Sequence, residues 1–225
     1  MARQTAISIN TIPIGPLGII GMPGCEELTD KIDQYLVKWR KTQAIEHAES
    51  IAFFGYQRDS YKIDITIPRF GSGEGKGVIN ESVRGYDIYI VCDVFNYSCT
   101  YNMYGKEVCM SPDDHFADLK RVISALCSKP KRVSVIMPML YEGRQHKRSS
   151  RESLDCAMAL KELVHLGVEN IITFDAHDQR VQNAIPDKSF ENVMPTYQMI
   201  KALVNNVDDL KVDKDHLMVI SPDEG

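Results

Sequence analysis

Two short polar clusters in the second half of the chain hold the residues best suited to chemistry. The first follows the apolar run 132–138, where residues 144–151 contain four Lys/Arg and one His within eight positions. The second, Asp175-Ala-His177, follows the apolar run 170–174. Guanidinium groups bind phosphate oxygens, and an Asp/His pair suits a divalent metal or a proton relay. The two clusters therefore predict a polyphosphate substrate and its metal.

Each of these features also has a purely structural interpretation. A basic cluster such as 144–151 is often a solvated face, and Asp175 and His177 taken alone are typical of a strand-end cap. The glycine-rich loop, residues 70–77, could be a plain hairpin, because it contains neither a GK[ST] nor a GxGxxG motif. The place of the basic cluster directly after a buried strand favours the phosphate-binding interpretation.

Apolar runs and amphipathic segments alternate along the chain, as in an α/β fold. Strands are predicted at residues 61–67, 87–92, 132–138, 170–174 and 217–220. Helices are predicted where apolar positions recur at helical spacing, at residues 25–41, 113–127, 151–166 and 196–207. The Tyr- and Cys-containing segment 96–111 is expected to be an inserted surface excursion. The alternation predicts a mainly parallel sheet flanked by helices on both faces.

Composition excludes several classes of protein. The 225 residues have a net charge of −5, with 44% hydrophobic and 25% charged content, as in an ordinary globular protein. No apolar stretch approaches the roughly 18 residues that span a bilayer, so no membrane association is expected. A pI near 5.7 argues against a nucleic-acid binder. The six scattered cysteines lack metal-binding spacing, and no secretory signal is expected, so the protein is predicted to be cytoplasmic with reduced thiols.

Five motifs occur in an order and spacing that resembles ribose-phosphate pyrophosphokinases (phosphoribosyl pyrophosphate synthetases). They are Asn80-Glu-Ser-Val-Arg-Gly85, Gly143-Arg-Gln145, Ser150-Arg-Glu152, Asp175-Ala-His177 and Ser221-Pro-Asp223-Glu-Gly225. The resemblance runs from about Ile19 to the last residue and is interrupted near 96–111. It implies transfer of the diphosphoryl group of ATP to ribose 5-phosphate, which gives phosphoribosyl pyrophosphate and AMP and uses Mg²⁺. It also implies a homo-oligomer, a dimer or hexamer, in which a neighbouring subunit supplies part of the adenine pocket.

The resemblance assigns roles residue by residue. Phe70 is expected to stack on adenine, and Glu74 to accept a hydrogen bond from its exocyclic amine. Arg144 and Gln145 resemble the ATP-binding pair. His177 resembles the catalytic residue that contacts the ATP phosphates and magnesium. Asp223 resembles a carboxylate that binds both the metal and ribose 5-phosphate.

The resemblance also implies a domain organisation. Residues 1–18 are expected to form an N-terminal arm, 19–207 an N-terminal phosphoribosyltransferase-like domain, and 208–225 the start of a second, similar domain. The chain ends where such a fold normally starts a helix, so it is expected to be the front portion of a longer protein. The family's Lys/Arg catalytic loop and its ribose-phosphate loop would then lie beyond Gly225, and the 225-residue chain alone is expected to be inactive.

Two positions depart from the family pattern. Ser72 stands where the glycine-rich loop usually has Asp, and His146 replaces the Asp that usually follows Arg-Gln. These departures motivate a second hypothesis, a non-catalytic paralogue that assembles with active synthetase subunits and regulates them. A third is a phosphoribosyltransferase that consumes the diphosphate product, since it shares the domain type.

Overall fold

The computed structural model describes residues 13–46 and 57–221, so the predicted site residue Asp223 lies outside the described residues. The chain forms two compact units, which divide between Asn192 and Val193. The predicted division at 207/208 therefore falls inside the second unit and stays a prediction. The predicted N-terminal arm lies mostly outside the described residues, and its last two positions already belong to the first strand of the sheet.

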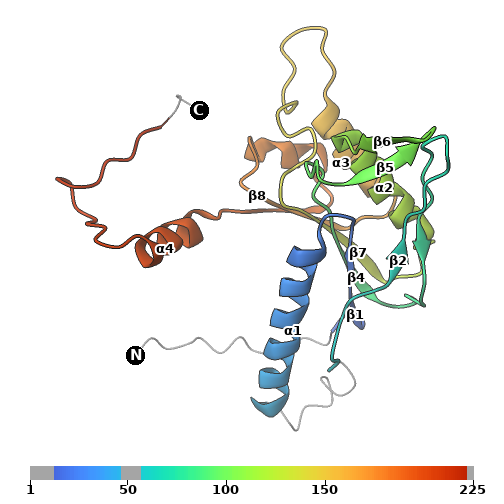
Figure 1. The fold of residues 1–225 in the computed structure, drawn as a ribbon, viewed down its shortest axis with the longest axis horizontal. Helices are drawn as coiled ribbons and strands as arrows, with labels where there is room; N and C mark the ends of the chain where they lie inside the picture. The colour runs from blue at the N-terminus through green and yellow to red at the C-terminus, as the bar shows by residue number, and fades with distance from the viewer. Residues whose placement is uncertain (1–12, 47–56, 222–225) are drawn as a thin grey trace. The chain divides into compact units, whose positions relative to one another are not determined.

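A five-stranded sheet forms the centre of the first unit (Figure 1). Its order is β1-β4-β7-β8-β9, with bounds Leu17–Gly21, Asp87–Val91, Arg132–Met137, Asn170–Phe174 and Ser189–Val193. The pairs β1·β4, β4·β7 and β7·β8 are parallel. Strand β4 is buried on both faces, because a parallel sheet covered by helices needs apolar side chains on each side.

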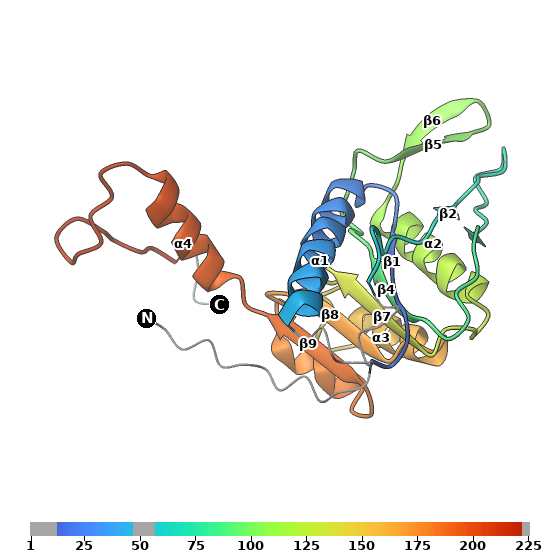
Figure 2. The same ribbon diagram turned by 90° about the horizontal axis from the view of Figure 1, so that it is seen from below.

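Helices cover both faces of this sheet, as Figure 2 shows. Helix α1 (Glu26–Glu46) packs Ile32 and Leu36 against the face that carries Ile19 and Val91. Helices α2 (Pro112–Ala125) and α3 (Asp155–His165) cover the opposite face. That face belongs to the larger core, whose members include Ile88, Ile90, Val133, Val135, Leu119, Val122, Leu160 and Leu163. The predicted α/β class, a mainly parallel sheet between helices, is confirmed.

Two antiparallel hairpins extend this core. The first pairs β2 (Ile65–Thr66) with β3 (Val78–Ile79), and the glycine-rich loop connects them. The second pairs β5 (Thr100–Met103) with β6 (Lys106–Cys109), so the predicted excursion is a β-hairpin. The strand predicted at 61–67 is regular only at β2. Upstream of β2, the chain hydrogen-bonds to β1 at one point, where Ile19 N donates to Tyr61 O and Ile63 N to Ile19 O, both at 2.8 Å.

Two predicted elements need correction. The helix predicted to start at 151 begins at Asp155, because Ser149 and Ser150 instead donate side-chain hydrogen bonds to Glu152 at 2.9 and 2.8 Å. Local bonds of this kind compete with a helix start. The strand predicted at 217–220 is wrong, since that apolar run pairs with no described strand and its last three side chains are 77–90% exposed. Strands β1, β3 and β9 were not predicted, and β5 and β6 were predicted only as part of a surface excursion.

The second unit contains helix α4 (Thr196–Asn206), close to the helix predicted at 196–207. Its apolar side chains recur at helical spacing, yet none of them is buried. Among the described residues of the whole chain, no helix is long and apolar enough to cross a membrane.

Candidate functional site

The carboxyl ends of β7 and β8 bring the two polar clusters of the sequence together. These strands are parallel neighbours, with Met137 opposite Thr173, so the loops that follow them leave the sheet at the same edge. The loop after β7 carries His146, and the loop after β8 carries His177. The two imidazole rings have centroids 5.1 Å apart and planes tilted by 34°. The predicted phosphate-binding and Asp/His segments therefore form one surface.

In the basic cluster 144–151, no Lys or Arg makes an ion pair among the described residues, although Arg148 acts electrostatically on Glu152. Its four cations are all exposed, and no carboxylate of the described chain lies within ion-pair distance of them: Arg144, Lys147, Arg148 and Arg151. The arginines of the core are different. Arg69 and Arg121 both bind Asp118, and Arg132 binds Asp87. The charge of the cluster is therefore available to an external polyanion, whereas the core arginines are already paired.

His146 joins the two loops of this surface. Its side chain is only 10% exposed, its Nε2 lies 3.4 Å from Asp178 Oδ2, and its Nδ1 is buried without a described partner. Asp178 also caps the short helix η2 (Gln179–Ala184) and accepts hydrogen bonds from the Arg180 guanidinium. Those bonds hold the pKa of the Asp178 carboxyl well below its usual range, so it stays ionised. His146 was noted in the sequence only as a departure, and its contact with His177 could not be seen there.

Backbone strain marks both loops. Asp175, directly after β8, has φ +47°, and Glu142, two residues before Arg144, has φ +55°. Neither is glycine, and such conformations cost on the order of 1–3 kcal/mol and cluster at functional sites. The amide of Ala176 donates to Asn192 Oδ1 at 2.9 Å, which fixes the turn that presents Asp175 and His177. Both of these side chains are exposed.

The side chains at this sheet edge can be compared with the ligands that the expected Mg²⁺ would need. Within residues 13–46 and 57–221, no group of three or more His, Cys, Asp and Glu is arranged to hold a metal ion. Mg²⁺ is usually held by one or two carboxylates together with waters and substrate phosphates. The exposed Asp175 carboxylate fits that role, and the imidazole of His177 suits contact with phosphate oxygens better than Mg²⁺.

The glycine-rich loop presents Phe70 and Glu74 on the β2–β3 hairpin. Phe70 is 57% exposed, and the turn is closed by bonds of 2.8 Å from Phe70 N to Glu74 O and from Gly73 N to Phe70 O. Ser72 Oγ donates to Glu74 Oε2 at 2.8 Å. Glycine is needed in this loop because a Cβ at Gly77 would lie 2.8 Å from the backbone of Arg121 in α2.

The predicted nucleotide residues fall into two groups in one chain. Across the described residues, no hydrogen bond, ion pair or ring contact joins Phe70 or Glu74 to Arg144, Gln145 or His177. The first group lies on the β2–β3 hairpin, and the second on the loops after β7 and β8. Their shared role in binding ATP stays a prediction.

Comparison with known proteins agrees with this architecture. Residues 17–167 match the family model of the N-terminal domain of ribose phosphate pyrophosphokinase. The ribose-phosphate pyrophosphokinase of Pasteurella multocida (strain Pm70) is 26% identical over 165 residues, covering 72% of this chain and 46% of that protein. The enzyme of the same name from Vibrio cholerae serotype O1 is 26% identical over 166 residues, with the same coverage. The chain spans about half the length of the curated relatives it matches.

A solved structure shows the same fold. The phosphoribosylpyrophosphate synthetase from Mycobacterium smegmatis superposes with a TM-score of 0.61 and 18% identity, over 84% of this chain and 52% of that one. The family match covers well over half of the chain and includes the glycine-rich loop and the basic cluster. The chain therefore belongs to the ribose-phosphate pyrophosphokinase family, whose N-terminal domain is formed by its residues 17–167.

Proposed function

We propose that this chain carries the nucleotide-binding part of a ribose-phosphate diphosphokinase. The reaction is transfer of the β,γ-diphosphoryl group of Mg-ATP to the anomeric hydroxyl of ribose 5-phosphate. The observation that carries the proposal is the basic cluster, whose four cations make no described ion pair and whose His146 packs against His177 at the carboxyl-end edge of a parallel sheet. Family membership supports the reaction class.

The chemistry asks for positioned charge more than for covalent participation by the protein. The anomeric oxygen attacks the β-phosphorus, the bond from that phosphorus to the α,β-bridging oxygen breaks, and AMP leaves as the hydroxyl proton passes to solvent or a base. Phosphoryl-type transfer of this kind is accelerated mainly by orientation and electrostatic stabilisation. Arg144 offers a planar fork of N–H donors to phosphate oxygens. His177, exposed on the loop after β8, is proposed to contact the transferring group.

Mg²⁺ would bind mainly through the nucleotide phosphates and would neutralise their charge when present. The residues of this chain placed to meet it are Asp175, by its exposed carboxylate, and Asp223, by family resemblance. His146 and Asp178 are proposed to have an indirect role. His146 packs against the ring of His177 and is itself held by Asp178, so together they would fix the position of the His177 ring.

The adenine is proposed to be read by Phe70 and Glu74 of a neighbouring subunit. Phe70 offers an exposed aromatic face, and Glu74 offers a carboxylate that can accept from the exocyclic amine. Because this pair makes no described contact with Arg144 or His177 of its own chain, a homo-oligomer would complete the site. The proposed location is the cytoplasm.

A second candidate is a non-catalytic paralogue that assembles with active subunits and regulates them. The observation in its favour is the bond from Ser72 Oγ to Glu74 Oε2 at 2.8 Å, which occupies one oxygen of the carboxylate that should read adenine. The presence of His146 where the family has Asp points the same way.

Release of AMP from ATP in the presence of ribose 5-phosphate separates the two candidates. The full-length protein should form AMP and phosphoribosyl pyrophosphate in equal amounts, and the 225-residue chain alone should form neither. An inactive full-length protein that changes the activity of a co-expressed synthetase would favour the paralogue. Turnover by the 225-residue chain would show that the acceptor site lies within it.

A further inference from the structure

The β5–β6 hairpin is fixed to the core at its base. Asn96 Nδ2 donates to Gly24 O at 3.0 Å, and the buried His115 ring is hydrogen-bonded to Asn96 O at 2.8 Å. At the other end of the excursion, Ser111 caps helix α2 and forms a capping box with Asp114. The hairpin therefore leaves the core in a defined direction.

Its far end contacts the glycine-rich loop. Tyr104 N donates to Gly71 O at 2.8 Å. Gly73 packs so closely against Met103 that an added Cβ would lie 2.9 Å from the Met103 sulfur. Gly71 and Gly73 lie between Phe70 and Glu74, so these contacts hold the turn that sets the two side chains relative to each other.

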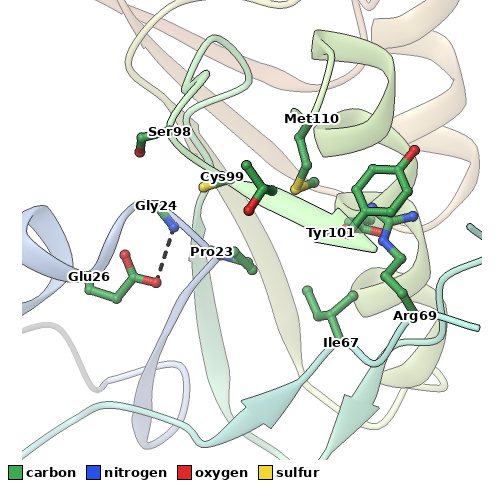
Figure 3. A pocket seen from close by; sticks show the side chains of 11 residues that line it. Pro23, Gly24, Glu26, Ile67, Arg69, Ser98, Cys99, Tyr101 and Met110 are labelled. Carbon is green, nitrogen blue, oxygen red and sulfur yellow. Dashed lines mark hydrogen bonds and ion pairs between the residues drawn. The ribbon is translucent and has the colours of Figure 1, made fainter. Parts of the chain in front are cut away.

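Tyr101 reaches the same loop through Arg69. The Arg69 guanidinium lies 4.5 Å from the centroid of the Tyr101 ring, and the two side chains face each other in Figure 3. Arg69 Nη1 donates to Gly73 O at 3.1 Å, and Nη2 donates to Asp118 Oδ2 at 2.6 Å. Asp118 is 2% exposed, so the Arg69 guanidinium is anchored in the core through Nη2 and bonded to the loop backbone through Nη1.

A cavity lies beside the base of the hairpin. It has a volume of about 330 Å³ and is bordered by Pro23, Glu26, Ile67, Cys99 and Met110 among others (Figure 3). The described contacts of the hairpin with Arg69 and the glycine-rich loop are those of Tyr101, Met103 and Tyr104.

We propose that the β5–β6 hairpin positions the glycine-rich loop for recognition of the nucleotide base, with Tyr101 as a positioning residue that acts through Arg69. This inference rests on the proposed role of Phe70 and Glu74 in binding adenine. The hairpin lies in the segment that interrupts the family resemblance. In this proposal it supports a glycine-rich loop that has Ser72 in place of the usual Asp.

Hydrogen exchange tests the positioning role without reference to activity. Tyr101→Ala should raise exchange of the amides of residues 70–76 by at least about 10-fold, because the loop loses its support and opens more often. Tyr101→Phe keeps the ring over Arg69 and should exchange like the wild type. Tyr97→Ala is the matched control, since Tyr97 belongs to the same excursion and is 66% exposed. Met103→Ala replaces Tyr101→Ala if the latter does not fold.

Steady-state kinetics of the full-length protein test the consequence for the base. Tyr101→Ala should raise the KM for ATP about 3- to 10-fold, the range expected for a lost cation–π contact, while kcat stays within about twofold. The preference for ATP over GTP should fall, and Tyr101→Phe should restore both. Unchanged exchange and unchanged KM in Tyr101→Ala would overturn the inference.

Parallel substitution of the loop itself separates this inference from the proposed function. If Phe70→Ala and Glu74→Gln weaken ATP but Tyr101→Ala does not, the loop binds the base and the hairpin does not position it. If neither loop substitution affects ATP, the proposed adenine role fails, and the base-recognition role of the hairpin is overturned with it.

Discussion

Replacing Arg144 by Ala is the most direct test of the proposed phosphate site. The Arg144 side chain is exposed, and in the part of the chain that the structure describes it makes no hydrogen bond or ion pair. Its removal therefore leaves no buried partner unsatisfied. Surface substitutions of this kind change the free energy of unfolding by less than about 0.5 kcal/mol. Any large effect of Arg144→Ala should then appear in ligand binding and not in stability.

The size of that effect follows from the chemistry of the contact. A hydrogen bond to a charged group contributes about 1.5–3 kcal/mol, and a guanidinium can give two parallel N–H donors to one phosphate. Loss of the contact should lower the affinity for Mg-ATP about 10- to 100-fold. Arg144→Lys should recover only part of the loss, because an ammonium is a point charge without the planar fork.

Titration calorimetry of Mg-ATP on the full-length protein measures this directly. Lys161→Ala is a suitable control, since it removes an exposed cation from helix α3, outside the basic cluster. Equal ATP affinities for wild type and Arg144→Ala would remove Arg144 from the site. A melting temperature lowered by several degrees would instead show that Arg144 has a structural role that the described contacts do not reveal.

Three further predictions address the base, the transferring group and the thiols. Glu74→Gln should reduce the use of ATP as donor several-fold and that of GTP much less, and an unchanged ATP:GTP ratio would show that the base is read elsewhere. His177→Ala should lower kcat more than it raises the KM for ATP, because its contact is expected to strengthen in the transition state; a change in KM alone in the AMP-release assay would contradict this role. Burial raises the pKa of the Cys25 and Cys156 thiols to about 11, so at pH 8 only about 0.1% is thiolate. Iodoacetamide should therefore label the exposed Cys109 and Cys127 first, and labelling of Cys25 should rise as the pH approaches 11; equal rates at pH 8 would show that Cys25 is accessible.

The central strands could be predicted because their burial is visible in the sequence. Strands β4, β7 and β8 are short, nearly continuous apolar runs, the pattern of strands covered on both faces. Strand β9 alternates exposed and half-buried residues at the end of the sheet order, and β1 follows a segment rich in Pro and Gly, so neither stands out. The run 217–220 was wrongly predicted as a strand because it is apolar. Apolar residues form a strand only when a partner strand is available.

The polar interactions of the site depend on contacts between residues far apart in sequence. The order of motifs located the basic cluster and Asp175-Ala-His177 at one sheet edge. It could not indicate that His146 packs on His177 or that Arg69 pairs with Asp118 across 49 positions. The sequence also could not show that Asn80, in the first of the five motifs, donates from Nδ2 to Asp64 Oδ2 at 2.8 Å beside the β2–β3 hairpin.

The two groups of predicted ATP-binding residues differ in how firmly the rest of the chain holds them. The basic cluster lies on a strained loop whose cations make no described ion pair, so we expect a bound polyanion to complete its geometry. The glycine-rich loop is already fixed by Asp118, Arg69 and the β5–β6 hairpin, so its geometry exists before any ligand arrives. Preorganisation of this kind favours selectivity, since a rigid loop loses little entropy when it binds the correct base. We therefore expect base selectivity to depend on the hairpin side of the domain, and affinity for the phosphates to depend on the loops after β7 and β8.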